Sequence, residues 1–383
     1  MTLTRRGALT LLGTAGGTAV IAGRAWSQSN PFKIGVVASM TGPASPFFRE
    51  YVDAFRAYVT VWNKNGGVKG RPVVLEILDD ESGAVQALSA YKRLAGDRET
   101  MTAWVANPGA AGLAIKAIAS EVKLPVVSGG ALDQLGVPAD PYFFKISPAN
   151  SSYAKLFFVW VKSHDMKRVA LLLSNDAYGQ GEAQTAKEQT QKLGLEIAGL
   201  ETFSPSDTSF SSQLARLRGT AHDILYIGAS GAAGILIFKQ IRQFNLKPPI
   251  AFMLAALTDA FFQAIGGAEK ADGIVTPGLL GMLGARAEGA SGVLYGKLAE
   301  ALGRPGSLGN ALGWDIGIVT QAAIEGSDAT RSGIRDALDR TRELPGINGP
   351  INFTPANHIA QDVRGMAMMK LAGGKFVYAD ASS

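Results

Sequence analysis

Short apolar runs alternate with segments of helical periodicity along most of the chain. In the first part, the apolar runs predict buried strands over residues 32–39, 73–78, 101–106, 126–128 and 142–146. Between them, apolar residues recur every three or four positions and predict helices over 46–63, 83–97 and 109–123. A strand that alternates with a helix in this way is typical of a parallel, doubly wound sheet, so we predict an α/β domain here.

The same alternation restarts after residue 149. It predicts strands over 169–173, 195–203, 224–227, 250–252 and 274–276, and helices over 153–164, 181–193, 211–218, 232–244 and 258–265. A glycine-rich loop at 278–289 is then followed by helices over 291–302, 308–325 and 332–340 and by strands over 349–353 and 366–371. Because 383 residues exceed one ordinary core, we predict two similar lobes.

Small residues follow two neighbouring strands of the first half. They are Pro108, Gly109, Ala110 and Ala111 after one strand and Gly130, Ala131 and Leu132 after the next. The free backbone N–H groups of a first helical turn, together with the helix dipole, favour an anion or a carbonyl oxygen. Open α/β sheets bind ligands in the crevice at the carboxyl ends of their strands. We therefore expect a ligand site here; the alternative is that small residues only let helices pack closely on the sheet.

The amino terminus has the pattern of an export signal. Arg5 and Arg6 precede an uncharged run rich in Gly, Ala and Leu, and small residues for cleavage follow. We predict a twin-arginine export signal over 1–27 and a mature protein in the periplasm. The alternative is an uncleaved anchor, for which the run is short and glycine-rich.

Charge gives no reason to expect a nucleic acid partner. The chain carries a net charge of +5, but the predicted signal holds three arginines and no acid, so 34 basic residues face 32 acidic ones after its removal. No polybasic tract remains for nucleic acid or for an anionic membrane.

The inventory of reactive side chains is small. The chain has no cysteine, which excludes disulfides, thiolate nucleophiles and cysteine metal sites, and only three histidines. Asp79, Asp80 and Glu81 end a predicted strand; they could chelate a hard cation, but we favour a role in capping the next helix and meeting solvent. We predict neither a cofactor nor a metal.

One glycine-rich segment resembles two catalytic motifs without completing either. Residues 228–234 read G-x-x-G-x-x-G, whereas a dinucleotide site has G-x-G-x-x-G. No Asp or Glu follows until residue 259, so the acid that would bind the ribose is also missing. Ser230 mimics a nucleophile elbow, but Ala232 replaces the last glycine and His358 is the only later histidine. His358 lies in a polar loop, where we expect it to be solvated. A serine hydrolase that uses Ser230 therefore stays the enzyme alternative.

Five segments together resemble the leucine/isoleucine/valine-binding family of periplasmic solute receptors. They are residues 34–43, 65–72, 79–82, 176–181 and 207–210, and their order and spacing carry the likeness. The resemblance covers essentially the whole chain after the predicted signal. It implies the type I periplasmic binding fold, with two Rossmann-like lobes joined by a three-crossover hinge. The N-terminal lobe would comprise 31–148 plus 277–350, and the C-terminal lobe 149–276 plus 351–383.

The resemblance also implies a receptor that closes on a small ligand and delivers it to the permease of an ABC-type importer. By that pattern, the ligand lies between the two small-residue bends and four further residues: Phe47, Tyr178, Ser230 and Ala256.

Three positions depart from relatives that bind α-amino acids. Ala110 and Leu132 replace hydroxyls that hold the carboxylate, and Ala256 replaces a carboxylate that holds the ammonium. A buried ammonium without a counter-charge costs roughly several kcal/mol, although Asp176 or Asp259 could substitute. We therefore expect a small apolar or aromatic solute, an amino acid or an organic acid that lacks the α-amine, with Arg49 as a second partner for its carboxylate. A ligand-sensing receptor for a signalling partner is the other alternative.

Overall fold

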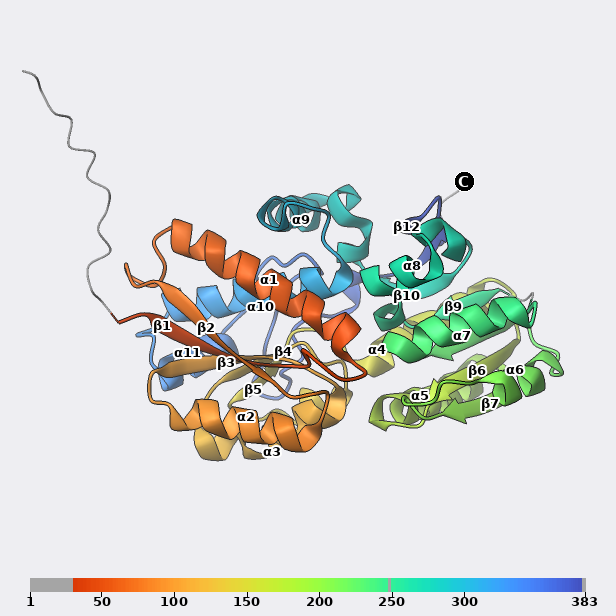
Figure 1. Cartoon of the computed structure of the whole chain (residues 1–383), viewed down its shortest axis with the longest axis horizontal. Coiled ribbons are helices and arrows are strands. Elements are labelled where there is room, and N and C mark those ends of the chain that lie inside the picture. The colour runs from red at the N-terminus through yellow and green to blue at the C-terminus, as the bar shows by residue number, and fades with distance from the viewer. Residues whose placement is uncertain (1–29, 247–248, 381–383) are drawn as a thin grey trace, which may run out of the picture.

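Two α/β lobes lie side by side along the long axis of the molecule (Figure 1). The computed structural model describes residues 30–246 and 249–380, so the predicted export signal lies outside the described residues. Within those ranges, no helix combines the length and the apolar character that crossing a membrane requires.

The first lobe is built on a five-stranded, all-parallel sheet in the order β2-β1-β3-β4-β5. Its strands are β1 (Phe32–Ala38), β2 (Val73–Asp79), β3 (Thr100–Ala106), β4 (Val126–Ser128) and β5 (Phe143–Lys145). One face packs against α2 (Ala84–Gly96) and α3 (Gly109–Val122), and the other against α1 (Ser45–Lys64) and α10 (Leu308–Glu325). Alternate residues of a strand point to opposite faces of the sheet, so they pack in two different cores. Trp104 packs on the α1 side and Val105 on the α3 side.

The second lobe has a seven-stranded sheet in the order β12-β11-β10-β9-β8-β6-β7. Its strands are β6 (Arg168–Ser174), β7 (Glu196–Phe203), β8 (Ile224–Gly228), β9 (Ile250–Phe252), β10 (Val275–Leu279), β11 (Met366–Ala372) and β12 (Lys375–Tyr378). Only the pairs of β11 with β10 and β12 are antiparallel. The helices of this lobe are α4 (Asn150–Ser163), α5 (Ala177–Leu193), α6 (Ser211–Arg218), α7 (Gly231–Gln243) and α8 (Asp259–Ile265).

The remaining helices connect or cover these layers. They are α9 (Gly289–Leu302), α11 (Arg331–Asp339) and the short 3-10 turns η1 (Asp133–Leu135), η2 (Leu254–Ala256), η3 (Ala268–Ala271), η4 (Leu280–Arg286) and η5 (Val363–Gly365).

Helix α1 shows why the periodicity of the sequence predicts its element well. Phe47, Tyr51, Phe55 and Tyr58 recur at spacings of three and four and are all buried, so one face of the helix joins the core. On α10, glycines face this helix. A Cβ at Gly313 would come within 2.8 Å of the Tyr51 carbonyl oxygen, so the two helices approach more closely than larger residues allow.

The chain crosses between the lobes three times, and the predicted fold class is confirmed. Two predicted boundaries need correction. Strand β10 pairs within the second sheet as far as Leu279, so the chain leaves that lobe after residue 279 and not at 277. Ile351 and Phe353 are buried in the first-lobe core, and Ile359 pairs with Lys145 of β5. Gln361 still donates its N–H to the Ile146 carbonyl oxygen, so the final crossing follows residue 361 and not 350. The predicted strand at 349–353 is reduced to an isolated bridge between Leu344 and Ile351.

Candidate functional site

The first small-residue bend joins β3 to α3. Pro108 is the N-cap of α3 and no side chain caps the helix, so its first-turn N–H groups lack a side-chain partner. Ala110 is exposed at this end, whereas Ala111 is completely buried in the core beneath α3. The uncapped backbone N–H groups of this bend are therefore accessible only near Ala110.

The second bend follows β4 and is more tightly tied than predicted. The Gly130 N–H donates to Ser128 Oγ at 3.1 Å, and Ser147 Oγ donates to the Gly130 carbonyl oxygen at 2.7 Å. Gly129 lies against the Tyr51 ring, where an added Cβ would collide. The Gly130 N–H is thus occupied inside its own turn, and Ala131 is the half-buried residue that remains at the surface.

The two bends lie next to each other, as their adjacent strands require. The Leu132 side chain covers Gly109, and a Cβ at Gly130 would come within 2.5 Å of Leu135 Cδ1. Leu132 is only 3% exposed and packs in the same core as Ala111. At these positions the small residues allow close packing. Only the Ala110 end of the first bend is left uncovered by these leucine side chains.

The acidic segment after β2 organises the neighbouring loop. Asp79 accepts hydrogen bonds from the Met40 and Thr41 N–H groups, and buried Asp80 accepts them from Ser39 Oγ at 2.7 Å and Asn107 Nδ2 at 2.9 Å. Helix α2 has no side-chain cap, so the favoured capping role of these acids is wrong. In residues 30–246 and 249–380, no group of three or more potential ligands is placed to hold a metal ion.

Tyr178 is the candidate residue that most clearly reaches from one lobe to the other. It lies in the first turn of α5, where Asp176 Oδ1 accepts from the Gly179 N–H at 3.0 Å and caps the helix. The half-buried Tyr178 side chain packs against the apolar core of the second lobe and also against that beneath α3 in the first. Burial, followed by the negative charge of Glu182, raises the pKa of the Tyr178 hydroxyl well above its usual value.

The turn between β8 and α7 touches the first lobe. Ser230 is exposed as the N-cap of α7, and its side chain caps nothing. Gly231 has a φ of +56°, and a Cβ there would lie 2.5 Å from the Pro43 carbonyl oxygen in the β1–α1 loop. This close approach places Ser230 at the boundary between the lobes.

Phe47 and Ala256 lie deeper than predicted. Ala256 is 1% exposed and packs beneath α7, 3.1 Å from the Cβ position of Gly234. Phe47 is 7% exposed, with its ring 5.4 Å from that of Tyr51, in an apolar cluster that includes Leu254 of the second lobe. Phe47 thus lies at the lobe boundary, whereas Ala256 belongs to the second-lobe core.

His358 is not solvated, and that prediction is wrong. It is 2% exposed, its ring stacks on Phe144 at 4.2 Å, and its two ring nitrogens lie 3.0 Å from the Phe143 carbonyl oxygen and 3.3 Å from Asp339 Oδ1. In the described part of the chain, Ser230 has no hydrogen bond to any histidine. The residues needed for a serine hydrolase are not assembled around Ser230.

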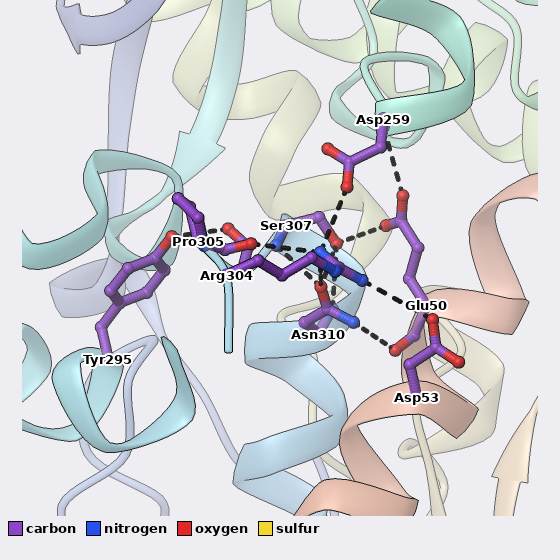
Figure 2. A network of polar contacts seen from close by, with 9 residues as sticks. Glu50, Asp53, Asp259, Tyr295, Arg304, Pro305, Ser307 and Asn310 are labelled. Carbon is purple, nitrogen blue, oxygen red and sulfur yellow. Dashed lines mark hydrogen bonds and ion pairs between the residues drawn. The ribbon is translucent and has the colours of Figure 1, made fainter. Parts of the chain in front are cut away.

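A polar cluster that the sequence analysis missed joins the lobes at the start of α8; we call it the Glu50 cluster (Figure 2). Glu50 of α1 accepts hydrogen bonds from the Asp259 N–H at 3.3 Å and from Ser307 Oγ at 2.7 Å. Arg304 lies 3.4 Å from the Asp259 carboxylate and 3.6 Å from that of Asp53. Because Asp259 alone belongs to the second lobe, the cluster stabilises contact between the lobes.

We expect Glu50→Gln to remove a pH dependence of stability. Burial raises the pKa of Glu50 from 4.5 to about 7, against the hydrogen bond from Ser307. A carboxyl with a higher pKa when folded contributes stability that is complete below pH 4.5 and is lost as the pH rises through 7. The loss amounts to at most about 3 kcal/mol.

Urea unfolding at several pH values between 4.5 and 7.5 measures this effect. Wild type should lose stability relative to Glu50→Gln across this window, while Glu300→Gln, at an exposed position of α9, should follow wild type. If the free energy of unfolding varied with pH in the same way for wild type and Glu50→Gln, the raised pKa assigned to Glu50 would be wrong.

Two α/β lobes that are joined by three crossings and meet at the carboxyl ends of their strands define the class of type I periplasmic binding proteins. The chain belongs to the periplasmic binding protein family, whose profile matches residues 31–375.

Two relatives illustrate the relationship. The chain is 24% identical over 353 residues to the Leu/Ile/Val-binding protein BraC3 of Rhizobium johnstonii, covering 91% of this chain and 93% of BraC3. It is 28% identical over 241 residues to Leu/Ile/Val-binding protein homolog 3 of Brucella melitensis, where the match spans 61% of this chain and 64% of the relative, just under two thirds of that protein's length.

Solved structures show the same fold. The substrate-binding protein LivJ of Streptococcus pneumoniae, in complex with isoleucine, matches with a TM-score of 0.82 at 22% identity, covering 91% of this chain and 98% of LivJ. A solute-binding protein of an ABC transporter from R. palustris, in complex with benzoate, matches with a TM-score of 0.80 at 21% identity, covering 91% and 96% of the two chains.

Proposed function

We propose that this chain is an exported receptor that captures a small apolar or aromatic carboxylic acid between its lobes and passes it to the permease of an ABC-type importer. Family membership supports the role as a solute receptor. The solved relatives hold isoleucine in one case and benzoate in the other, so the fold accommodates both an amino acid and an aromatic acid.

The ligand is proposed to lie between the exposed end of the α3 bend and the second-lobe residues Tyr178 and Ser230. Its carboxylate would meet the uncapped N–H groups near Ala110, which favour negative charge. Ala131 and Phe47 would complete the first-lobe side. Arg49 is exposed on α1 and stays a proposed second partner for the carboxylate.

The proposed ligand class rests on one observation. Asp176 and Asp259, the two acids that could replace the missing counter-charge for an ammonium, both have other partners. Asp176 Oδ1 caps α5 and also accepts from Ser174 Oγ at 2.7 Å, which holds this carboxylate at the start of its own helix, and Asp259 pairs with Arg304 in the Glu50 cluster. Ala256 supplies no charge. An α-ammonium would therefore lose its hydration without a carboxylate dedicated to it, at a cost of roughly several kcal/mol.

Titration calorimetry with two sets of ligands tests this proposal. We expect benzoate, phenylacetate and 3-phenylpropanoate to include a ligand that binds at micromolar concentration or tighter, and leucine, isoleucine and valine to bind at least about tenfold more weakly, equivalent to about 1.4 kcal/mol. Tight leucine binding with no binding of any aromatic acid would refute the proposed ligand class.

A further inference from the structure

Glu182 is a buried carboxyl group of the second lobe that the sequence analysis did not single out. It lies on α5, four residues after Tyr178, and is 2% exposed. Its Oε1 accepts a hydrogen bond from the Tyr226 hydroxyl at 2.5 Å, while Oε2 has no hydrogen-bond partner among the described residues. A buried carboxyl oxygen without a hydrogen-bond donor is costly when it is charged, so this arrangement favours the neutral acid over the carboxylate.

The unpaired oxygen lies close to the proposed ligand site. Oε2 faces Gly228, the last residue of β8, so closely that a Cβ there would collide with it. Ser230 follows two residues later, and Tyr178 precedes Glu182 by about one helical turn. Glu182 thus lies directly behind the second-lobe wall that Tyr178 and Ser230 would form.

The surroundings of Glu182 are apolar and carry no positive charge that acts on it. It lines a small cavity of about 10 Å³, room for about one water molecule, together with Ala154, Phe157, Phe158, Leu171, Leu173, Ala186 and Tyr226. The titratable groups that act on it are Tyr178 and Asp176 of α5 and Tyr226 of β8. Burial raises the pKa of Glu182 to about 8, against the hydrogen bond from Tyr226, so the group is mostly a neutral carboxylic acid at pH 7.

We propose that Glu182 is the specificity-determining residue of the second lobe: its neutral carboxylic acid accepts a ligand whose inner end is uncharged and disfavours one that carries an α-ammonium. This inference rests on the proposed function and narrows its ligand class. A neutral acid supplies no counter-charge to an ammonium, and pairing with one would require Glu182 to release its proton. Ionised Glu182, in turn, would repel the carboxylate of an organic acid across the site.

The test compares 3-phenylpropanoate with L-phenylalanine, which differ only in the α-amine. For wild type, we expect the affinity for 3-phenylpropanoate to weaken about tenfold between pH 7 and pH 9 as Glu182 ionises. Glu182→Gln should bind it with an affinity that varies less than about twofold over this range. Glu188→Gln, at an exposed position of the same helix, should keep the wild-type profile.

A measurement on wild type alone keeps the inference testable if Glu182→Gln does not fold. Calorimetry at pH 8 in two buffers of different ionisation enthalpy should show uptake of about half a proton per 3-phenylpropanoate bound. If the affinity of wild type for 3-phenylpropanoate did not change between pH 7 and pH 9 and no proton were taken up, the role of Glu182 would be overturned and the proposed function would stay intact. Tighter binding of L-phenylalanine than of 3-phenylpropanoate at pH 7 would overturn the proposed ligand class itself.

Discussion

Replacing Gly231 with alanine should weaken ligand binding by at least tenfold while the protein still folds. Gly231 opens α7 with a φ of +56°, and a Cβ there would lie 2.5 Å from the Pro43 carbonyl oxygen of the other lobe. The left-handed backbone costs alanine about 1–2 kcal/mol whether the lobes are apart or together, so it lowers stability without changing affinity. The contact with Pro43 exists only when the lobes meet, so it opposes closure and with it binding.

Gly289→Ala is the matched control for this prediction. Gly289 also opens a helix at positive φ, +63° at the start of α9, but a Cβ there would meet nothing within 4 Å. Both variants should lose similar stability in thermal unfolding, and only Gly231→Ala should lose affinity in titration calorimetry. Equal affinities for the two variants would show that the β8–α7 turn does not limit closure.

Replacing Asp315 with alanine should destabilise the protein by about 3–5 kcal/mol. Asp315 is completely buried on α10 and accepts hydrogen bonds from the Ile347 and Asn348 N–H groups at 2.6 and 3.0 Å and from the Gln361 side chain at 2.7 Å. The Asn348 side chain donates to it as well. Truncation would leave these buried donors without an acceptor, in the segment that leads to the last lobe crossing.

Urea unfolding at pH 7.5 measures this loss. Glu325→Ala, at an exposed position of the same helix, is the control and should change the free energy of unfolding by no more than about 0.5 kcal/mol. A loss below about 1 kcal/mol for Asp315→Ala would mean that water satisfies the freed donors and that the buried network contributes little.

Much of the fold could be predicted because its elements are strongly periodic or strongly apolar. Helix α1 was predicted within about one residue at each end, since its buried face repeats every three or four positions. The last lobe crossing was misplaced because Ile351 and Phe353 form an apolar alternation like that of a strand, yet they pack into the first core from irregular backbone. The apolar pattern of this segment predicts that its side chains are buried, but it does not predict which lobe they pack against.

The candidate site was harder to predict because it depends on which side chains cover the backbone. The two bends do lie side by side, but Leu132 covers Gly109 and Leu135 covers Gly130, contacts that no spacing rule supplies. Glu182 carried no clear signal in the sequence. The buried face of α5 that holds it also holds Thr185, Gln189 and Thr190, so the pattern of apolar residues does not mark this face as buried.

Pulsed electron–electron double resonance between spin labels on the two lobes tests most directly whether the ligand is captured by closure of the lobes. The chain has no cysteine, so Lys92→Cys on α2 and Lys187→Cys on α5, both at exposed positions, would take spin labels at these two places only. With saturating amounts of the aromatic acid that binds best, the account predicts that the distance distribution narrows and shifts toward the closed arrangement, and that Gly231→Ala resists this shift. An unchanged distribution in the presence of a saturating bound ligand would contradict capture by closure of the two lobes.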